Sequence, residues 1–117
     1  SKVYFQTEYK YWIERRGVFR VLVPPYYPLK FHLEFELTSE LLEKADTVRL
    51  NVEFNGARFG AFTYNESGRH HLEQAVKDHS LSWKRDSEIV IEVIAEHGRH
   101  WKSFELGLFV TSLGFRL

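Results

Sequence analysis

The sequence predicts an all-β protein: an antiparallel β-sandwich of two sheets, with one short helix. Leu29–Leu37 alternates apolar and polar side chains without interruption, and Thr47–Phe54 repeats the pattern. Successive side chains of a strand point to opposite faces, so each segment predicts a strand with one buried and one solvated face. Strands of a parallel sheet are covered on both faces, so this alternation favours antiparallel pairing.

Length and composition limit the class of protein. The chain has 117 residues, which we take as a single domain spanning residues 1–117. Sixteen basic residues balance sixteen acidic ones, which argues against a nucleic-acid binder and against a polybasic membrane anchor. No apolar stretch approaches the ~20 residues of a membrane span. The chain begins with Ser1 and has no methionine, so we expect a domain excised from a larger protein.

The segments before Leu29–Leu37 predict three further strands. They are residues 3–6, 9–13 and 18–23, with a tight connection at residues 14–17. Pro24 and Pro25 end the third strand, because proline has no backbone donor for a ladder.

Residues 39–45 predict the helix. Ser39 can cap its first turn, and Glu40 lies near the positive end of the helix dipole. Leu41, Leu42 and Ala45 then fall on one face.

The second half of the chain predicts a hairpin and further strands. Asn55-Gly56 is the strongest hairpin signal, because both residues tolerate positive φ, and residues 58–64 form the returning strand. Residues 70–78 fit a helix and a strand almost equally. Residues 88–95 predict a buried strand whose outer side Val90 and Ile94 make partly apolar. Residues 104–117 predict one long strand or two shorter ones, bent near Gly107 or Gly114.

The order of motifs resembles a known family. Tyr11-Trp12-Ile13-Glu14 and Gly17-Val18-Phe19-Arg20 are followed by Phe54-Asn55-Gly56 and by Glu105-Leu106-Gly107-Leu108-Phe109-Val110. This order resembles the small galactose-binding-like β-sandwich domains that accompany bacterial glycosyltransferases and other surface-polysaccharide enzymes, and the resemblance implies a sandwich of the jelly-roll type. The chain departs from the family's Asp-x-Arg pair, because Lys102 and Phe104 stand at those places.

The resemblance implies a function as well as a fold. It implies a non-catalytic accessory domain, either carbohydrate-binding or docked on a parent enzyme, with no catalytic residues. It implies an association with the bacterial cell envelope or with a cytoplasmic parent enzyme, although the residues themselves leave the localisation unknown.

Six histidines raise the question of a metal site. His70 and His71 are adjacent, and adjacent residues of a strand point to opposite faces, so the two cannot ligate one ion from a strand. The chain has no cysteine, which removes the thiolate ligands of zinc sites, and only three aspartates. We therefore predict solvated surface histidines, with no metal and no cofactor.

Catalytic signals are weak. Glu34 and Glu36 share one face of a strand, but alternating charge is usual on any half-exposed strand. The sequence has no glycine-rich phosphate loop and no nucleophile elbow. We assign no catalytic residue, and a small hydrolase is the least favoured function.

Aromatic residues in the expected loops favour carbohydrate binding. Flat rings stack on the apolar faces of sugars, and neighbouring polar groups bind the hydroxyls. The candidate binding residues are Tyr26, Tyr27, Trp83, Arg99, His100 and Trp101. The alternative is that Trp12 and one other tryptophan are core or lid residues and that the two tyrosines cover a sheet end. A structural or dimerising domain without glycan affinity also stays open.

Overall fold

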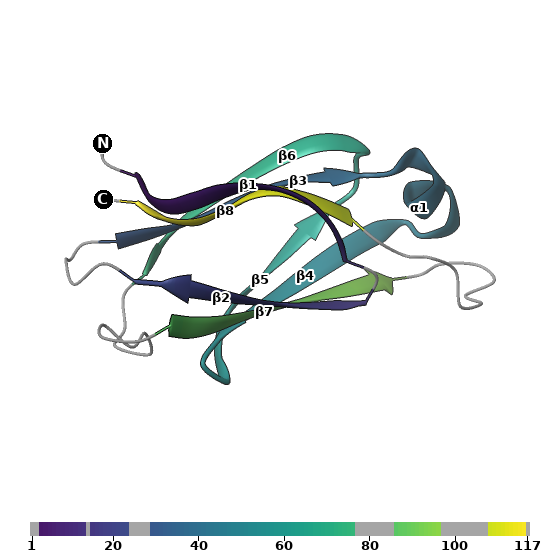
Figure 1. The fold of residues 1–117 in the computed structure, drawn as a ribbon. Helices are drawn as coiled ribbons and strands as arrows, with labels where there is room; N and C mark the ends of the chain where they lie inside the picture. Colours follow the sequence, from purple (N-terminus) through teal and green to yellow (C-terminus); the bar gives the residue numbers. More distant parts are fainter. Residues whose placement is uncertain (1–2, 14, 24–28, 77–85, 97–107, 117) are drawn as a thin grey trace.

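The computed structural model describes residues 3–13, 15–23, 29–76, 86–96 and 108–116. Within these residues eight strands form two antiparallel four-stranded sheets (Figure 1). The elements are β1 (Val3–Ile13), β2 (Arg16–Leu22), β3 (Leu29–Leu37), α1 (Ser39–Lys44), β4 (Thr47–Phe54), β5 (Ala57–Tyr64), β6 (Gly68–Val76), β7 (Asp86–Glu96) and β8 (Leu108–Arg116). The all-β sandwich predicted from the alternating segments is confirmed.

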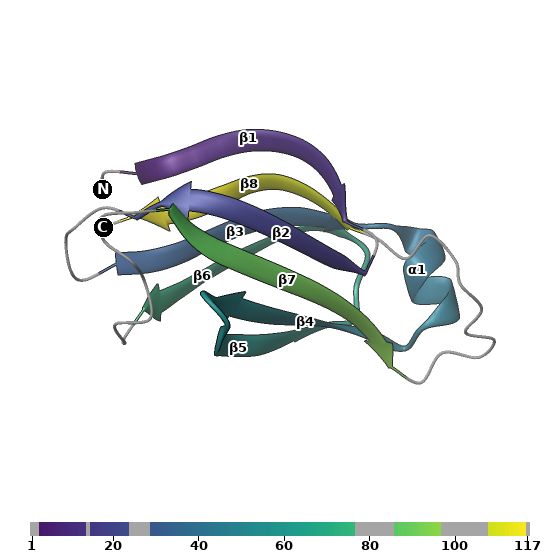
Figure 2. The same cartoon turned by 60° about the horizontal axis from the view of Figure 1, so that its bottom comes forward.

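The two sheets enclose one apolar interior, and Figure 2 shows them as two layers. Sheet A has the strand order β1-β8-β3-β6 and sheet B the order β2-β7-β4-β5. The apolar side chains of β3 and β4 are almost entirely buried, as their alternation predicts. Across the interior, the ring of Phe31 lies edge-on to that of Phe54 at 5.3 Å, and within sheet A it lies 5.7 Å from that of Phe115. Such aromatic contacts add to the free energy gained by burying the rings.

The N-cap of the helix lies one residue earlier than expected. Thr38, and not Ser39, is the N-cap, and its hydroxyl accepts a hydrogen bond from the Leu41 amide at 3.3 Å. Leu41 is buried, so the helix contributes to the core. Within the part of the chain that the structure describes, no helix is long and apolar enough to cross a membrane.

The predicted hairpin is present between β4 and β5. Asn55 and Gly56 have φ values of 51° and 83°, which the mirror-image hairpin turn requires. The Asn55 side chain also accepts a hydrogen bond from the Glu88 amide at 2.8 Å, which ties the turn to β7.

Several strands differ from their expected extents, and one ambiguity is settled. β2 begins at Arg16, so residues 16 and 17, which were expected in a tight connection, belong to the strand, and β5 and β7 extend one or two residues beyond the predicted 58–64 and 88–95. Residues 3–6 and 9–13 are one strand, β1, which is interrupted only by register shifts against β8. Residues 70–76 are strand and not helix, because β6 pairs with β3 along its whole length. β8 continues through Gly114 without a break, while residues 104–107 lie outside the described residues.

β8 contains a bulge that changes which side chains point inwards. Its register against β3 places Ser112 opposite Glu34 and Val110 opposite Phe35, so Thr111 is an extra residue between them. The Thr111 hydroxyl donates a hydrogen bond to the Glu34 carbonyl at 3.2 Å. As a result, Val110 and Leu113 are both fully buried although they are three residues apart.

Candidate functional site

The six carbohydrate-binding residues predicted from the loops lie outside the described residues, so that assignment stays a prediction. They are Tyr26, Tyr27, Trp83, Arg99, His100 and Trp101. The strand ends that flank residues 24–28 and 77–85 lie at one end of the sandwich, where β2 pairs with β7 and β3 with β6. The strand ends that flank residues 97–107 lie at the other end, beside α1.

Among the described residues, a group of titratable side chains lies close together on the outer face of sheet A, which is the face turned away from sheet B. The alternation of β3 places His32, Glu34 and Glu36 there, because their neighbours point into the core. β6 runs antiparallel beside β3 and places His71 opposite Glu34 and Glu73 opposite His32.

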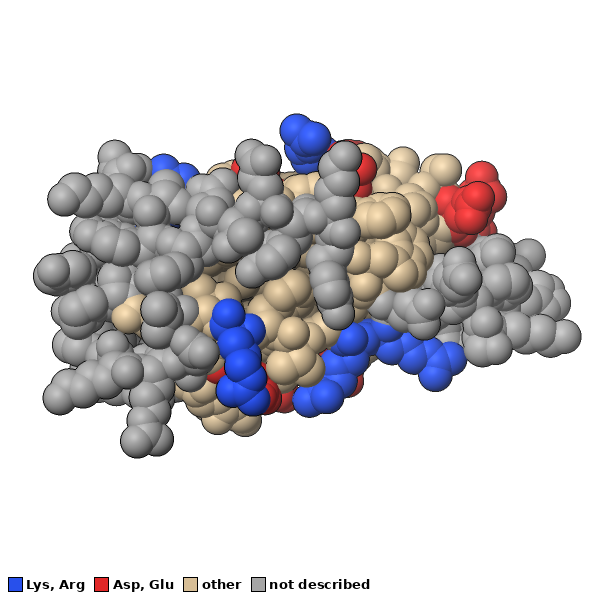
Figure 3. Space-filling view, viewed as in Figure 1, with Lys and Arg blue, Asp and Glu red and all other residues tan. Residues whose placement is uncertain are grey.

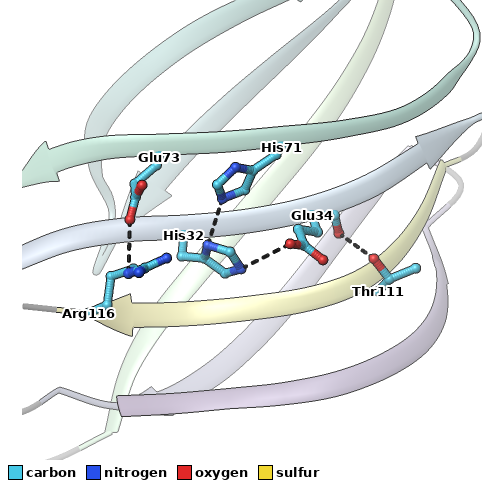
Figure 4. A network of polar contacts seen from close by, with 6 residues as sticks. All are labelled: His32, Glu34, His71, Glu73, Thr111 and Arg116. Atoms are coloured by element: carbon cyan, nitrogen blue, oxygen red, sulfur yellow. Dashed lines mark hydrogen bonds and ion pairs between the residues drawn. The ribbon is translucent and has the colours of Figure 1, made fainter. Parts of the chain in front are cut away.

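A cluster of three side chains, His32, Glu34 and His71, lies over β3 and the edge strand β6 on this face (Figure 4). Nε2 of His71 lies 2.9 Å from Nδ1 of His32, so the two rings share one hydrogen bond. Nε2 of His32 lies 3.8 Å from Oε1 of Glu34, beyond hydrogen-bond distance. One donor atom from each of the three residues lies within 4.8 Å of the other two. We call these residues the His–Glu cluster.

His32 is not the solvated surface histidine expected from the sequence. Only 2% of it is exposed, although it lies on the outer face. Burial lowers the pKa of His32, the nearby His71 lowers it further, and Glu34 opposes the shift. The ring is therefore neutral at neutral pH, so one of its two nitrogens has a proton and the other a lone pair.

The adjacent His70 lies on the other side of β6. Its Nε2 lies 2.7 Å from the Glu66 carbonyl oxygen, to which it donates a hydrogen bond. Its ring stacks on the buried ring of Phe35 at 5.4 Å. The expectation that His70 and His71 point to opposite faces is thus confirmed. Sequence reasoning missed that β3 brings His32 into contact with His71. The available signal was the pair His32 and Glu34, two residues apart on one face of an alternating strand.

An aromatic pair lies on the same face, at the end of sheet A nearer to α1. Trp12 of β1 and Phe109 of β8 are opposite each other in the ladder, with ring centroids 4.5 Å apart. Phe109 is 39% exposed, and Trp12 is half-buried. The alternative that places Trp12 in the core is wrong, because Trp12 packs against Phe109 on the outer face. Beside Phe109, Glu36 forms an ion pair with Arg69 of β6 at 3.5 Å.

The outer face of sheet B has a different character. Arg20 and Glu88 form an exposed ion pair at 3.5 Å, and the Asn51 amide donates a hydrogen bond to Glu92 at 3.3 Å. Figure 3 shows basic and acidic side chains lying beside each other over β2 and β7, at the bottom of that view. Val18 is 44% exposed on this face, and Val90 is buried, which agrees with the partly apolar outer side expected for β7.

Comparisons with known proteins agree on the fold. No protein-family model matches the sequence, and no curated protein matches it. The CBM36-1 domain of a multidomain xylanase from the hindgut metagenome of Trinervitermes trinervoides is similar in structure, with a TM-score of 0.58 and 14% identity over 87% of this chain and 70% of that one. A carbohydrate-binding module CBM36, solved with calcium and xylotriose, has a TM-score of 0.53 and 11% identity over 96% and 88% of the two chains.

A third solved structure, described as the EclA C-terminal domain, a sugar-binding protein, has a TM-score of 0.54 and 8% identity over 99% of this chain and 80% of that one. At such low identities the likeness concerns the fold and not the binding residues. The chain therefore shares the fold of these solved structures, which in this chain is a sandwich of two antiparallel four-stranded sheets.

Proposed function

We propose that this chain is a non-catalytic accessory domain that binds carbohydrate. The support from the fold is that solved neighbours are described as carbohydrate-binding modules, one of them in complex with xylotriose. We further propose that it is a single domain of a larger bacterial protein that handles cell-surface polysaccharide, which is the context that the resemblance in its motifs implies.

The observation that carries this proposal is the aromatic pair on the outer face of sheet A. Phe109 presents more than a third of its surface to solvent, and Trp12 supports its ring at 4.5 Å between centroids. A sugar can place its apolar C–H face on such a ring. Glu36 and Arg69 lie beside it and offer the acceptor and donor that the sugar hydroxyls need.

The loop residues predicted from the sequence are a second location for the same function. Tyr26, Tyr27 and Trp83 belong to segments whose flanking strand ends lie at one end of the sandwich, and Arg99, His100 and Trp101 to a segment whose flanking strand ends lie at the other. The proposal therefore names one sheet face and two loop ends as alternative binding sites.

Glycan-array binding of the wild type, followed by calorimetry with the best ligand, tests the function. Phe109→Ala should weaken binding at least about tenfold, because aromatic contacts with ligands contribute more than 1 kcal/mol. Val18→Ala is the matched control, since Val18 is a similarly exposed apolar residue on the opposite sheet and should leave binding unchanged.

The variants Trp83→Ala and Trp101→Ala separate the sheet face from the loop ends. Binding that survives Phe109→Ala but is lost in one of these variants would move the site to that end of the molecule. An intact chain that binds no glycan on the array would refute the function itself.

A structural or dimerising domain is the second candidate, and one observation favours it. Val18 is exposed on the outer face of sheet B and lies opposite the buried Val90 in the ladder, so this face is less polar than a fully solvated sheet face. Light scattering that shows the mass rising with concentration in the wild type, but not in Val18→Lys, would support it. A constant mass would exclude self-association through this face.

A further inference from the structure

We propose that His32, Glu34 and His71 form a binding site for a transition-metal dication such as Zn²⁺ on the outer face of sheet A. The proposal departs from our expectation, based on the sequence, that the histidines are solvated and that no metal is bound. It is also separate from carbohydrate binding, which rests on the aromatic pair at another part of the same face.

The donor set fits zinc. Two imidazoles and one carboxylate are common zinc ligands, and three protein ligands leave a fourth position for water. Zinc bonds of about 2.0–2.2 Å in tetrahedral geometry place ligand atoms about 3.4 Å apart. The donor atoms of the His–Glu cluster lie within 4.8 Å of one another, and the closest nitrogens are 2.9 Å apart. Nδ1 and Nε2 of one ring point in different directions, so Nε2 of His32 and the hydrogen-bonded Nε2 of His71 do not yet face a common point. His71 has to leave Nδ1 of His32 and turn, together with Glu34, for the three ligands to converge on one ion.

The freedom to rotate is present where it is needed. His71 is exposed, and the Glu34 side chain is 35% exposed, so both can move without disturbing the core. His32 is the fixed member, because it is 2% exposed and is held between its neighbours on the sheet. One rigid ligand with two adjustable ones can adapt to an incoming ion.

A second observation points to a missing ligand at His32. Its Nε2 is buried and has no hydrogen-bond partner among the described residues. Burying a polar nitrogen without a partner costs free energy, so such atoms are rare in folded proteins. A metal ion bound to Nε2, with the ring proton on Nδ1, would give this atom a partner and offset part of that cost.

The surrounding charges also favour a cation. The charged side chains that act on His32 are Glu34, Glu73 and Arg116, which are two acids and one base. Arg116 is already paired, with its Nε 3.1 Å from Oε1 of Glu73 (Figure 4). Glu34 therefore faces the two imidazoles as a carboxylate whose charge a dication can neutralise.

Zinc titration of the metal-free chain, prepared without an affinity tag, tests the proposal by calorimetry. His71→Gln should bind at least about tenfold more weakly than the wild type, since losing even a supporting residue of a metal site costs that much. His70→Gln is the matched control, because it makes the same change at the neighbouring residue on the opposite side of β6. It should bind as the wild type does.

A second matched pair tests the carboxylate. Glu34→Gln should weaken zinc binding, whereas Glu36→Gln, two residues along the same face and paired with Arg69, should not. Both positions are partly exposed, so these variants should fold; circular dichroism of each variant checks that they do.

Long-range ¹H–¹⁵N spectra of the imidazoles identify the histidines that bind. Zinc should shift the ring signals of His32 and His71 and leave those of His70 in place. The proposal is overturned if zinc shifts only the histidines of other segments, such as His97 and His100, or if His71→Gln and the wild type bind equally. Neither result would affect the proposed carbohydrate function, whose test uses Phe109.

Discussion

The outer faces of the two sheets are built by the same alternation, yet they differ in what they bury. On sheet B the described polar groups form exposed pairs, such as Arg20 with Glu88, whose side chains are 66% and 37% exposed. On sheet A the face contains a histidine that is 2% exposed and an aromatic pair in contact with solvent. The first arrangement is usual for a solvated sheet face, and the second resembles a binding surface.

The contrast shows that facing away from the core does not make a residue solvated. His32 lies beside Gly114 of β8 in the ladder, where no side chain competes for space, and its ring contacts that of His71 on β6. Neighbouring strands, and not the strand itself, therefore decide whether an outward residue is buried. Two predictions concern the shared interior and two concern the faces.

The largest expected effect compares how much a core residue of each sheet contributes to the free energy of unfolding. Phe31→Ala in sheet A and Phe54→Ala in sheet B should each lower the free energy of unfolding by about 3–5 kcal/mol, because both rings are fully buried and in contact. Urea denaturation measures both. The exposed Arg58→Ala is the control and should change stability by less than about 0.5 kcal/mol. A small loss at only one phenylalanine would mean that the sheets are unequally packed.

The next effect concerns the close approach of β2 to β1. A Cβ at Gly17 would lie 2.7 Å from Cδ1 of the buried Ile13, so Gly17→Ala should cost about 1–3 kcal/mol through overpacking. Gly60→Ala is the comparison, since there the contact is with the end of the half-buried Phe62 ring, which can move. Thermal denaturation should show a larger drop in Tm for Gly17→Ala; equal drops would contradict this explanation.

A smaller effect is expected in the pH dependence of stability, because His32 of sheet A is buried. The folded state lowers the pKa of His32 below its ordinary 6.5, so the unfolded chain binds a proton first as the pH falls. The contribution of His32 to the free energy of unfolding is therefore fully present above about pH 6.5 and is lost as the pH falls below that value. With a chelator present, unfolding free energies between pH 7.5 and 5 should fall more steeply for the wild type than for His32→Gln. Parallel profiles would refute this.

The smallest effect belongs to the outer face of sheet B. Arg20→Ala removes an exposed ion pair with Glu88 and should cost between 0 and about 1 kcal/mol. High salt should abolish the difference, because ions screen exposed charges. A double-mutant cycle with Glu88→Gln measures the pair directly. A coupling that persists in salt would show that this face is not simply solvated.

Much of the fold could be predicted from the sequence, because burial in a sandwich has a period of two. The alternation of β3 and β4 predicted both their extents and their core faces. Asn55-Gly56 predicted the hairpin because few residues adopt its positive φ values. The nature of residues 70–76 could not be decided, since β6 is an edge strand with few buried residues and its identity depends on pairing with β3.

The candidate site was less predictable, because it depends on register between strands far apart in the sequence. His32 and His71 are 39 residues apart, and only the β3–β6 ladder brings them together. The same holds for Trp12 and Phe109, which β1 and β8 align. The sequence could indicate which side of its own strand each residue occupies, but not which residue would lie beside it.

The extra residue at Thr111 limits how this strand can vary in related chains. Leu108 and Val110 point inwards on one side of it, and Leu113 and Phe115 on the other, so the two halves of β8 follow opposite parities. In a regular strand without the bulge, the same sequence would exchange inside and outside for half of its residues and turn Arg116 towards the phenylalanine rings. Loss of Thr111 alone would restore a regular strand with the same residues inside, so related chains should have either the extra residue together with its bulge or neither.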